Sequence, residues 1–230
     1  MADTLTRRML ARQAARLNVA CGMAGLLPPL ALLTDDERLP DPLAAARALP
    51  KGSLIVVRAR DPARRAALLD AMPRDLVRLV ADDPRLAAQA DGLHLPQARA
   101  GEAGHWRARH PRWLITAAAH GTVAHDPYLD AVFLSPVFPT RSHPGRAALG
   151  AVRANAMARA CGLPVYALGG IEAQNAQRLH GFAGIAAIGA LAFSSPVVTG
   201  EGDHRAAMME GGAIGSASSV SPLRGEPPPP

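Results

Sequence analysis

The chain has 230 residues, of which 49% are hydrophobic and 3% aromatic, enough to bury one substantial core and typical of a single α/β domain. Its formal net charge of +6 suits anionic ligands, but the sequence lacks a nucleic-acid-binding motif, so we expect no nucleic-acid partner. Its 2 cysteines stand outside the spacings of disulfide scaffolds and zinc sites, and no run reaches the about 20 hydrophobic residues of a membrane span, so we expect a cytoplasmic protein without a membrane partner.

Residues 1–27 are predicted to form a basic helix and a linker. Thr4 or Thr6 can cap a helix that ends near Asn18. One face of this helix is hydrophobic and carries Leu10, Ala14 and Leu17. Another face is basic and carries Arg8, Arg12 and Arg16. We expect the helix to cover one end of the domain that follows, with contact to a membrane or to RNA as the alternative.

Short hydrophobic runs alternate with Ala- and Arg-rich segments from Leu30 onward, which is typical of repeated strand–helix units. The predicted strands are residues 30–33, 54–57, 76–80, 92–95, 113–117, 131–134, 165–168 and 185–188. We therefore predict an α/β fold, a single (β/α)8 TIM barrel over residues 28–196. Residues 197–230 are rich in Gly, Ser, Met and Pro and are predicted to form a flexible low-complexity tail.

Polar residues or glycines follow almost every predicted strand, and a barrel gathers these strand ends on one face, where its chemistry takes place. Gly169 and Gly170 follow the seventh strand, and Gly189 and Ala190 follow the eighth. Glycines let backbone N–H groups approach a phosphate closely, and these two strand ends are the usual phosphate site of such barrels. We expect a small-molecule phosphate ligand there. The sequence does not indicate an oligomeric state.

Four segments, taken together and in order, resemble the thiamine phosphate synthase family and its thiazole tautomerase relatives. They are ADGLHLPQ (residues 90–97), FLSPVFPTRSHPG (133–145), PVYALGGI (164–171) and GIAAIGA (184–190). The resemblance implies a barrel enzyme of thiamine biosynthesis. Such an enzyme couples hydroxymethylpyrimidine diphosphate with a thiazole phosphate and releases diphosphate with Mg²⁺.

The same resemblance implies roles for individual residues. Arg58 corresponds to the arginine that follows strand two of the family, Asp82 to an aspartate that contacts Mg²⁺, and Thr140 to a loop threonine that contacts a phosphate. We therefore expect three catalytic residues, Arg58, Arg60 and His143, and one metal ligand, Asp82. The expected substrate- and phosphate-binding residues are Thr140, Ser135, Gly169, Gly170, Gly189 and Ala190.

The chain also departs from the family pattern, mainly around strands two and four. Val56 replaces a glutamine and Arg60 a lysine, while Arg99 lies in the segment where the family has an acidic pair that supplies a second Mg²⁺ ligand. Mg²⁺ usually binds through one or two carboxylates and substrate phosphates. Arginines and a protonated His143 could instead neutralise an anion without a metal.

These departures leave three functions open. The first is a synthase-like transferase with an incomplete family site, and the second is a non-catalytic or regulatory barrel that binds thiazole or thiamine phosphate. The third is an isomerase like the tautomerases, in which Pro136 replaces the family histidine and His94 or His143 could act instead. His94 lies within a strand, where a structural role is the more common one. His120 is either a site residue or a cap of its own loop.

Overall fold

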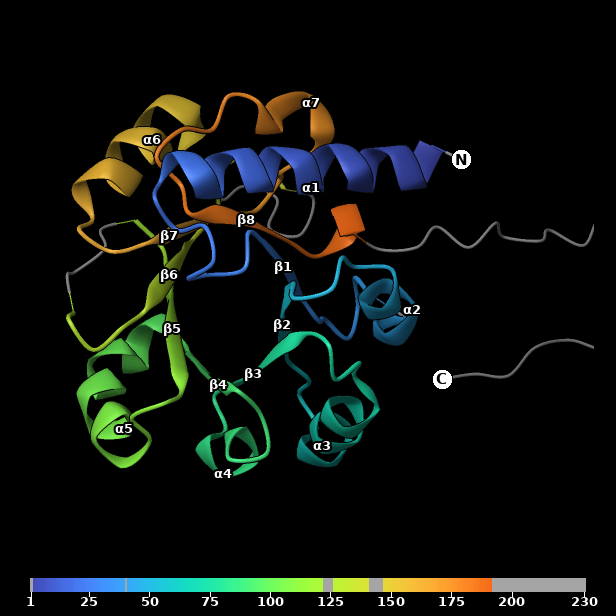
Figure 1. The fold of residues 1–230 in the computed structure, drawn as a ribbon, viewed down its shortest axis with the longest axis vertical. Helices are drawn as coiled ribbons and strands as arrows, with labels where there is room; N and C mark the ends of the chain where they lie inside the picture. The colour runs from blue at the N-terminus through green and yellow to red at the C-terminus, as the bar shows by residue number, and fades with distance from the viewer. Residues whose placement is uncertain (1, 40, 122–125, 141–146, 192–230) are drawn as a thin grey trace, which may run out of the picture. The chain divides into compact units, whose positions relative to one another are not determined.

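The computed structural model describes residues 2–39, 41–121, 126–140 and 147–191, and its strands form a closed parallel barrel (Figure 1). Each strand pairs with the next, and β8 pairs with β1. The strands are β1 (Leu30–Leu33), β2 (Leu54–Val57), β3 (Val77–Ala81), β4 (Gly92–Leu95), β5 (Leu114–Ala119), β6 (Ala131–Leu134), β7 (Val165–Leu168) and β8 (Gly184–Ala187). The predicted (β/α)8 barrel is confirmed, and the predicted limits of β3, β5 and β8 differ from these by one or two residues. The predicted tail, residues 197–230, lies outside the described residues.

Helices and short 3₁₀ segments connect the strands. They are α2 (Pro42–Arg47), α3 (Pro62–Ala71), α4 (Pro84–Ala87), η1 (Gln97–Glu102), α5 (Ala103–Arg109), α6 (Gly150–Ala160), α7 (Ala173–Ala176) and η2 (Gly189–Leu191). An Asp-Pro pair begins α2, α3 and α4: the aspartate side chain accepts hydrogen bonds from backbone N–H groups of the first turn, and proline takes the first helical position. The same two-residue signal therefore ends three of the loops at the carboxyl ends of strands.

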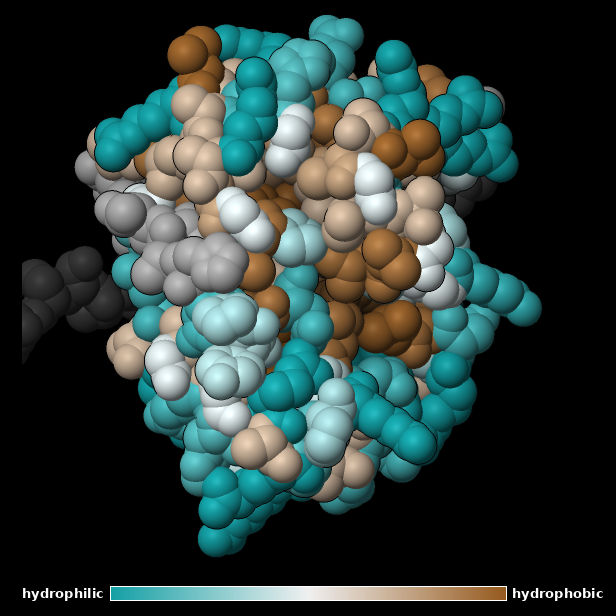
Figure 2. Space-filling model, turned by 60° about the vertical axis from the view of Figure 1, so that its left-hand side comes forward, coloured by the Kyte–Doolittle hydropathy of each residue, from teal (hydrophilic) through white to brown (hydrophobic). Residues whose placement is uncertain are grey.

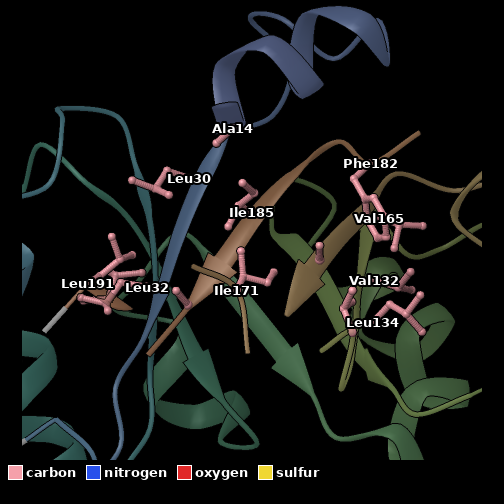
Figure 3. Packing of buried hydrophobic residues seen from close by; sticks show 14 of the residues in the cluster. Ala14, Leu30, Leu32, Val132, Leu134, Val165, Ile171, Phe182, Ile185 and Leu191 are labelled. Atoms are coloured by element: carbon pink, nitrogen blue, oxygen red, sulfur yellow. The ribbon is translucent and has the colours of Figure 1, made fainter. Parts of the chain in front are cut away.

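Alternate residues of each strand divide between two hydrophobic layers, because successive side chains of a strand point to opposite faces. The smaller layer fills the barrel interior, where the rings of Phe133 and Tyr166 stack with their centroids 4.8 Å apart. The larger layer joins the outer faces of the strands to the helices. Figure 3 shows part of this outer layer, with Leu30 and Ile185 beneath Ala14.

The N-terminal helix α1 (Ala2–Ala20) lies along the barrel wall, in contact with β1, β8, α7 and η2. Its buried residues include Leu10, Ala14 and Leu17, the face predicted from the sequence. Two expectations were wrong. The helix begins at Ala2, so that neither Thr4 nor Thr6 caps it, and it covers the β8–β1 seam rather than one end of the barrel.

The exposed large hydrophobic side chains of the described surface include Leu5, Val19, Leu26 and Val152. Figure 2 shows one face, which is hydrophilic over much of its area and has a group of hydrophobic residues near its centre. No helix in the described ranges is long and hydrophobic enough to cross a membrane. A cavity of about 460 Å³ lies at the amino ends of the strands, bounded by Asn18, Leu27, Gly52 and Val77 among others, and has few polar groups with which to do chemistry.

Asn18 fastens the end of α1 to the amino ends of two strands. Its buried Nδ2 donates to the carbonyl oxygens of Leu27 at 3.1 Å and Ala183 at 2.8 Å, just before β1 and β8. Both amide protons are thus used, and both carbonyls gain a partner that no backbone N–H supplies.

We expect Asn18→Ala to lower the free energy of unfolding by about 1–3 kcal/mol, because two buried carbonyl oxygens lose their donor. Arg16→Ala, on an exposed position of the same helix, is the control and should change it by less than about 0.5 kcal/mol. Chemical denaturation measures both values. Equal losses in the two variants would show that the Asn18 hydrogen bonds do not hold the helix.

Candidate functional site

The carboxyl ends of the strands carry two groups of polar residues. We call residues 135–140, 169–171, 189 and 190 the glycine half, and residues 34–38, 58–60, 82 and 99 the arginine half. The glycine half follows β6, β7 and β8, and the arginine half follows β1 to β4.

The glycine half depends on close packing between two backbones. The N–H groups of Val137 and Phe138 donate to the carbonyl oxygens of Leu168 and Gly169 at 2.9 and 3.0 Å. Gly169 and Gly170 have φ values of 95° and 63°, which favour glycine. A Cβ atom at Gly170 would lie 2.3 Å from the carbonyl oxygen of Pro139. Packing alone therefore requires this glycine pair.

Four backbone amides of the glycine half have no acceptor. Within the described part of the chain, the N–H groups of Gly170, Ile171, Gly189 and Ala190 make no hydrogen bond. Asn175 fixes the turn between them and α7, since its Nδ2 donates to the carbonyl oxygen of Gly170 at 2.8 Å. A Cβ atom at Gly189 would meet no atom within 4 Å. These amides thus have the donors and the space to bind an anion.

The remaining predicted residues of this half have different surroundings. Thr140 lies beside Gly169, because its Cγ2 would be 3.6 Å from a Cβ atom there. Ser135 instead faces the end of β5, with its Oγ 3.0 Å from Nδ1 of His120, whose backbone N–H donates to Oε1 of Gln97 at 2.6 Å. His143 lies outside the described residues. The contact between Ser135 and His120 was not predicted.

The arginine half surrounds a cavity of about 620 Å³ with an equal number of acidic and basic side chains. The lining residues are Asp35, Asp36, Glu37, Arg38, Arg58, Ala59, Arg60, Arg65, Ala81 and Asp82. The cavity therefore brings together the predicted Arg58, Arg60 and Asp82. Each of these arginines and acids has an ionic partner, so the cavity is close to neutral overall.

Arg58 follows β2 and lies in the cavity wall, where its side chain is 36% exposed. Its backbone N–H donates to Oγ1 of Thr34 at 2.6 Å, and its Nη2 lies 3.3 Å from Oδ2 of Asp35. Burial lowers the pKa of Arg58, and the charge of Asp35 opposes that effect. Burial would raise the pKa of Asp35, but hydrogen bonds from Arg38 hold it at about 2. Asp35 therefore stays ionised and is shared by two guanidinium groups.

Arg60 lies at the rim of the cavity. Its side chain is 84% exposed and pairs with Glu37 at 2.7 Å. A solvated ion pair of this kind contributes little to stability, and Arg60 is free to turn toward a ligand or toward water.

Asp82 is held by Arg99 rather than left open for a metal. Among the described residues it is the one non-glycine residue with a positive φ, 54°, and its N–H donates to the carbonyl oxygen of His94 at 3.0 Å. Its Oδ1 accepts a hydrogen bond from Nη1 of Arg99. The Nε and Nη2 groups of Arg99 donate to the two carboxylate oxygens of Glu102. Hydrogen bonds from Arg99 lower the pKa of Glu102 to about 2.

The donor set around Asp82 does not fit a resident Mg²⁺. Mg²⁺ prefers six oxygen ligands in octahedral geometry, and the described residues contain no group of three or more His, Cys, Asp or Glu side chains that could hold a metal. The predicted ligand Asp82 is paired with a guanidinium group. The Asp82 carboxylate therefore faces a guanidinium group where the resemblance implies Mg²⁺.

His94 belongs to the barrel interior. Its Nδ1 lies 2.9 Å from Oγ1 of Thr116, and its ring meets Phe133 edge-on with centroids 5.0 Å apart. Burial, and to a smaller degree the charge of Arg58, lower the pKa of His94 to about 3. The imidazole is thus neutral near pH 7 and a weak base, which fits a structural role.

Comparisons with known proteins agree with this architecture. A family model described as "Thiamine monophosphate synthase" matches residues 42–191. The "Putative thiamine-phosphate synthase 2" of Aquifex aeolicus (strain VF5) is 34% identical over 93 residues, 39% of this chain. The match spans half, 50%, of that relative's length.

Two solved structures from Pyrococcus furiosus were also found. A thiamine phosphate pyrophosphorylase superposes with a TM-score of 0.52 at 23% identity, over 69% of this chain and 84% of that chain. An N-(5'-phosphoribosyl)anthranilate isomerase superposes with a TM-score of 0.46 at 12% identity, over 69% and 86% respectively. The first of these supports the barrel fold.

We expect the glycines of the two strand ends to respond differently to alanine. Gly170→Ala should lower the free energy of unfolding by at least about 2 kcal/mol, because it combines a positive φ with an overlap on a backbone oxygen. Gly189→Ala should change it by less than about 0.5 kcal/mol, because its Cβ enters open space. Urea denaturation of both variants checks this, and similar losses would contradict the packing described above.

Burial lowers the pKa of His94 from 6.5 to about 3. Between these pH values the His94 imidazole therefore binds a proton in the unfolded chain but not in the folded chain. Stability should therefore fall as the pH falls below 6.5, by about 2 kcal/mol between pH 7 and pH 5 from this group alone. His94→Gln should remove that part of the pH dependence. Denaturation of both proteins at the two pH values is the measurement, and an unchanged pH dependence in the variant would refute the assignment.

Proposed function

Since the chain belongs to the thiamine monophosphate synthase family, we propose that it couples a hydroxymethylpyrimidine diphosphate with a thiazole phosphate and releases diphosphate. The observation that carries this proposal is the set of four amides without acceptors at the ends of β7 and β8. They follow two neighbouring strands, with open space at Gly189, and they would offer a neutral set of donors to one phosphate group.

The glycine half would bind the thiazole phosphate. Backbone N–H groups of Gly170, Ile171, Gly189 and Ala190 donate to the phosphate oxygens, and Thr140, beside Gly169, lies next to this site. Such donors need no rearrangement when the ligand arrives, because the glycine packing and Asn175 already fix the turn. The phosphate then holds the thiazole ring at the barrel mouth and fixes its orientation.

The arginine half would bind the pyrimidine diphosphate. In the reaction the bond between the pyrimidine methylene carbon and a diphosphate oxygen breaks, and the diphosphate keeps the electron pair. The thiazole nitrogen then donates its lone pair to that carbon. Arg58 would face the leaving diphosphate, because it lines the cavity and shares Asp35 with Arg38. Positive charge there stabilises the leaving group.

A second candidate is binding of a thiazole or thiamine phosphate without catalysis. The pairing of Asp82 with Arg99 favours it, because the carboxylate that would be expected to serve the diphosphate half is already engaged. The isomerase alternative gains no such support, since His94 is a weak base in the barrel interior; exchange of thiazole ring protons in deuterated water would identify that activity.

The test is to incubate the purified chain with both substrates and to follow thiamine phosphate by chromatography. We expect product, and we expect Gly189→Asp to abolish both product formation and thermal protection by the thiazole phosphate. Gly189→Asn has the same shape without the charge. It should therefore bind the thiazole phosphate at least about tenfold more tightly than Gly189→Asp does.

Thermal protection by the thiazole phosphate without product would leave the binding-only candidate. Protection that is unchanged in Gly189→Asp would refute the phosphate site itself.

A further inference from the structure

Arg99 joins two carboxylates that come from different segments of the chain. It lies in η1, after β4, and its guanidinium binds Glu102 through Nε at 2.8 Å and Nη2 at 2.7 Å. Its Nη1 binds Oδ1 of Asp82, after β3. One positive charge is thus held between two negative charges at the edge of the 620 Å³ cavity, which Asp82 lines.

The backbone of Asp82 and the carboxylate of Glu102 are held independently of Arg99. Asp82 has the left-handed backbone conformation, which aspartate tolerates better than most residues, and its N–H is bound to His94. Glu102 accepts a further hydrogen bond, at 3.2 Å, from Nε1 of Trp106. The two acidic groups therefore face a common point that the guanidinium fills.

We infer that Arg99 takes the place of a divalent cation at this edge of the cavity, so that the site works without Mg²⁺. A divalent ion at the point between the two carboxylates would have to displace a guanidinium group that makes three hydrogen bonds to them. It would also have to approach a fixed positive charge. The guanidinium group compensates one of the two carboxylate charges and places N–H donors at the rim of the cavity, where an ion would otherwise lie.

Arg99 also keeps donors for a ligand. A guanidinium group has five N–H donors, and the structure uses three of them on Glu102 and Asp82. The side chain is 36% exposed, so the remaining N–H groups can meet an oxygen of a diphosphate. This last step rests on the proposed function, whereas the exclusion of a metal does not.

The exclusion is tested by Mn²⁺ binding, followed by electron paramagnetic resonance of the free ion and by broadening of the Trp106 indole N–H signal in NMR spectra. The wild-type chain should bind no Mn²⁺ next to Trp106. Arg99→Ala should bind it at least about tenfold more tightly, because two fixed carboxylates lose their compensating charge. Arg74→Ala, which frees the single exposed carboxylate of Asp70, is the control of equal charge and should resemble the wild type.

The double variant Arg99→Ala/Asp82→Asn should lose the new site, since asparagine accepts the same backbone conformation but carries no charge. Mn²⁺ binding to the wild-type chain that Asp82→Asn abolishes would overturn the inference. So would Arg99→Ala that gains no binding while its circular dichroism matches that of the wild type.

Activity separates this inference from the proposed function. If both hold, the wild-type chain forms thiamine phosphate at the same rate with EDTA and with Mg²⁺. If no product forms under either condition while the Mn²⁺ results are as expected, the proposed coupling reaction fails and the role of Arg99 stands. Product that forms only with Mg²⁺ contradicts the role of Arg99 and supports the coupling reaction.

Discussion

The close contact between the segment after β6 and the glycine pair after β7 is the constraint on which the rest of the site depends. Val137 and Phe138 extend the β6–β7 pairing past the ends of both strands, and no side chain larger than hydrogen fits at Gly170. The chain then turns sharply into α7, where Asn175 secures the carbonyl oxygen of Gly170. Among the described residues the amide of Gly170 has no hydrogen-bond acceptor, and amides of this kind are typical of anion sites.

The two halves of the barrel mouth attract anions in different ways. The glycine half offers backbone dipoles and carries no charge of its own, so its donors are the same at every pH at which the barrel is folded. The arginine half consists of ion pairs, among them Arg58 with Asp35 and Arg99 with Asp82. A ligand there must compete with carboxylates for each guanidinium group, which favours a ligand of higher charge, such as a diphosphate, over a monophosphate.

Much of the fold was predictable, because strand length and the Asp-Pro signals are local properties of the sequence. The start of α1 was not, since Thr4 and Thr6 are good caps by residue type, yet both lie inside the helix. The glycine pair was identified for its phosphate role, although its packing role rests on Pro139, about 30 residues earlier in the chain. Asp82 was expected to bind a metal; its partner Arg99 comes from the next loop, and such contacts depend on side-chain directions that spacing does not reveal.

We propose that the amides at the ends of β7 and β8 bind the phosphate of a thiazole phosphate. The most direct test is a titration with that ligand, followed in ¹H–¹⁵N correlation spectra of the assigned chain. We expect downfield shifts of the amide protons of Gly170, Ile171, Gly189 and Ala190, all with one dissociation constant. Shifts confined to the arginine half, around Arg58 and Asp82, with these four amides unchanged, would contradict it.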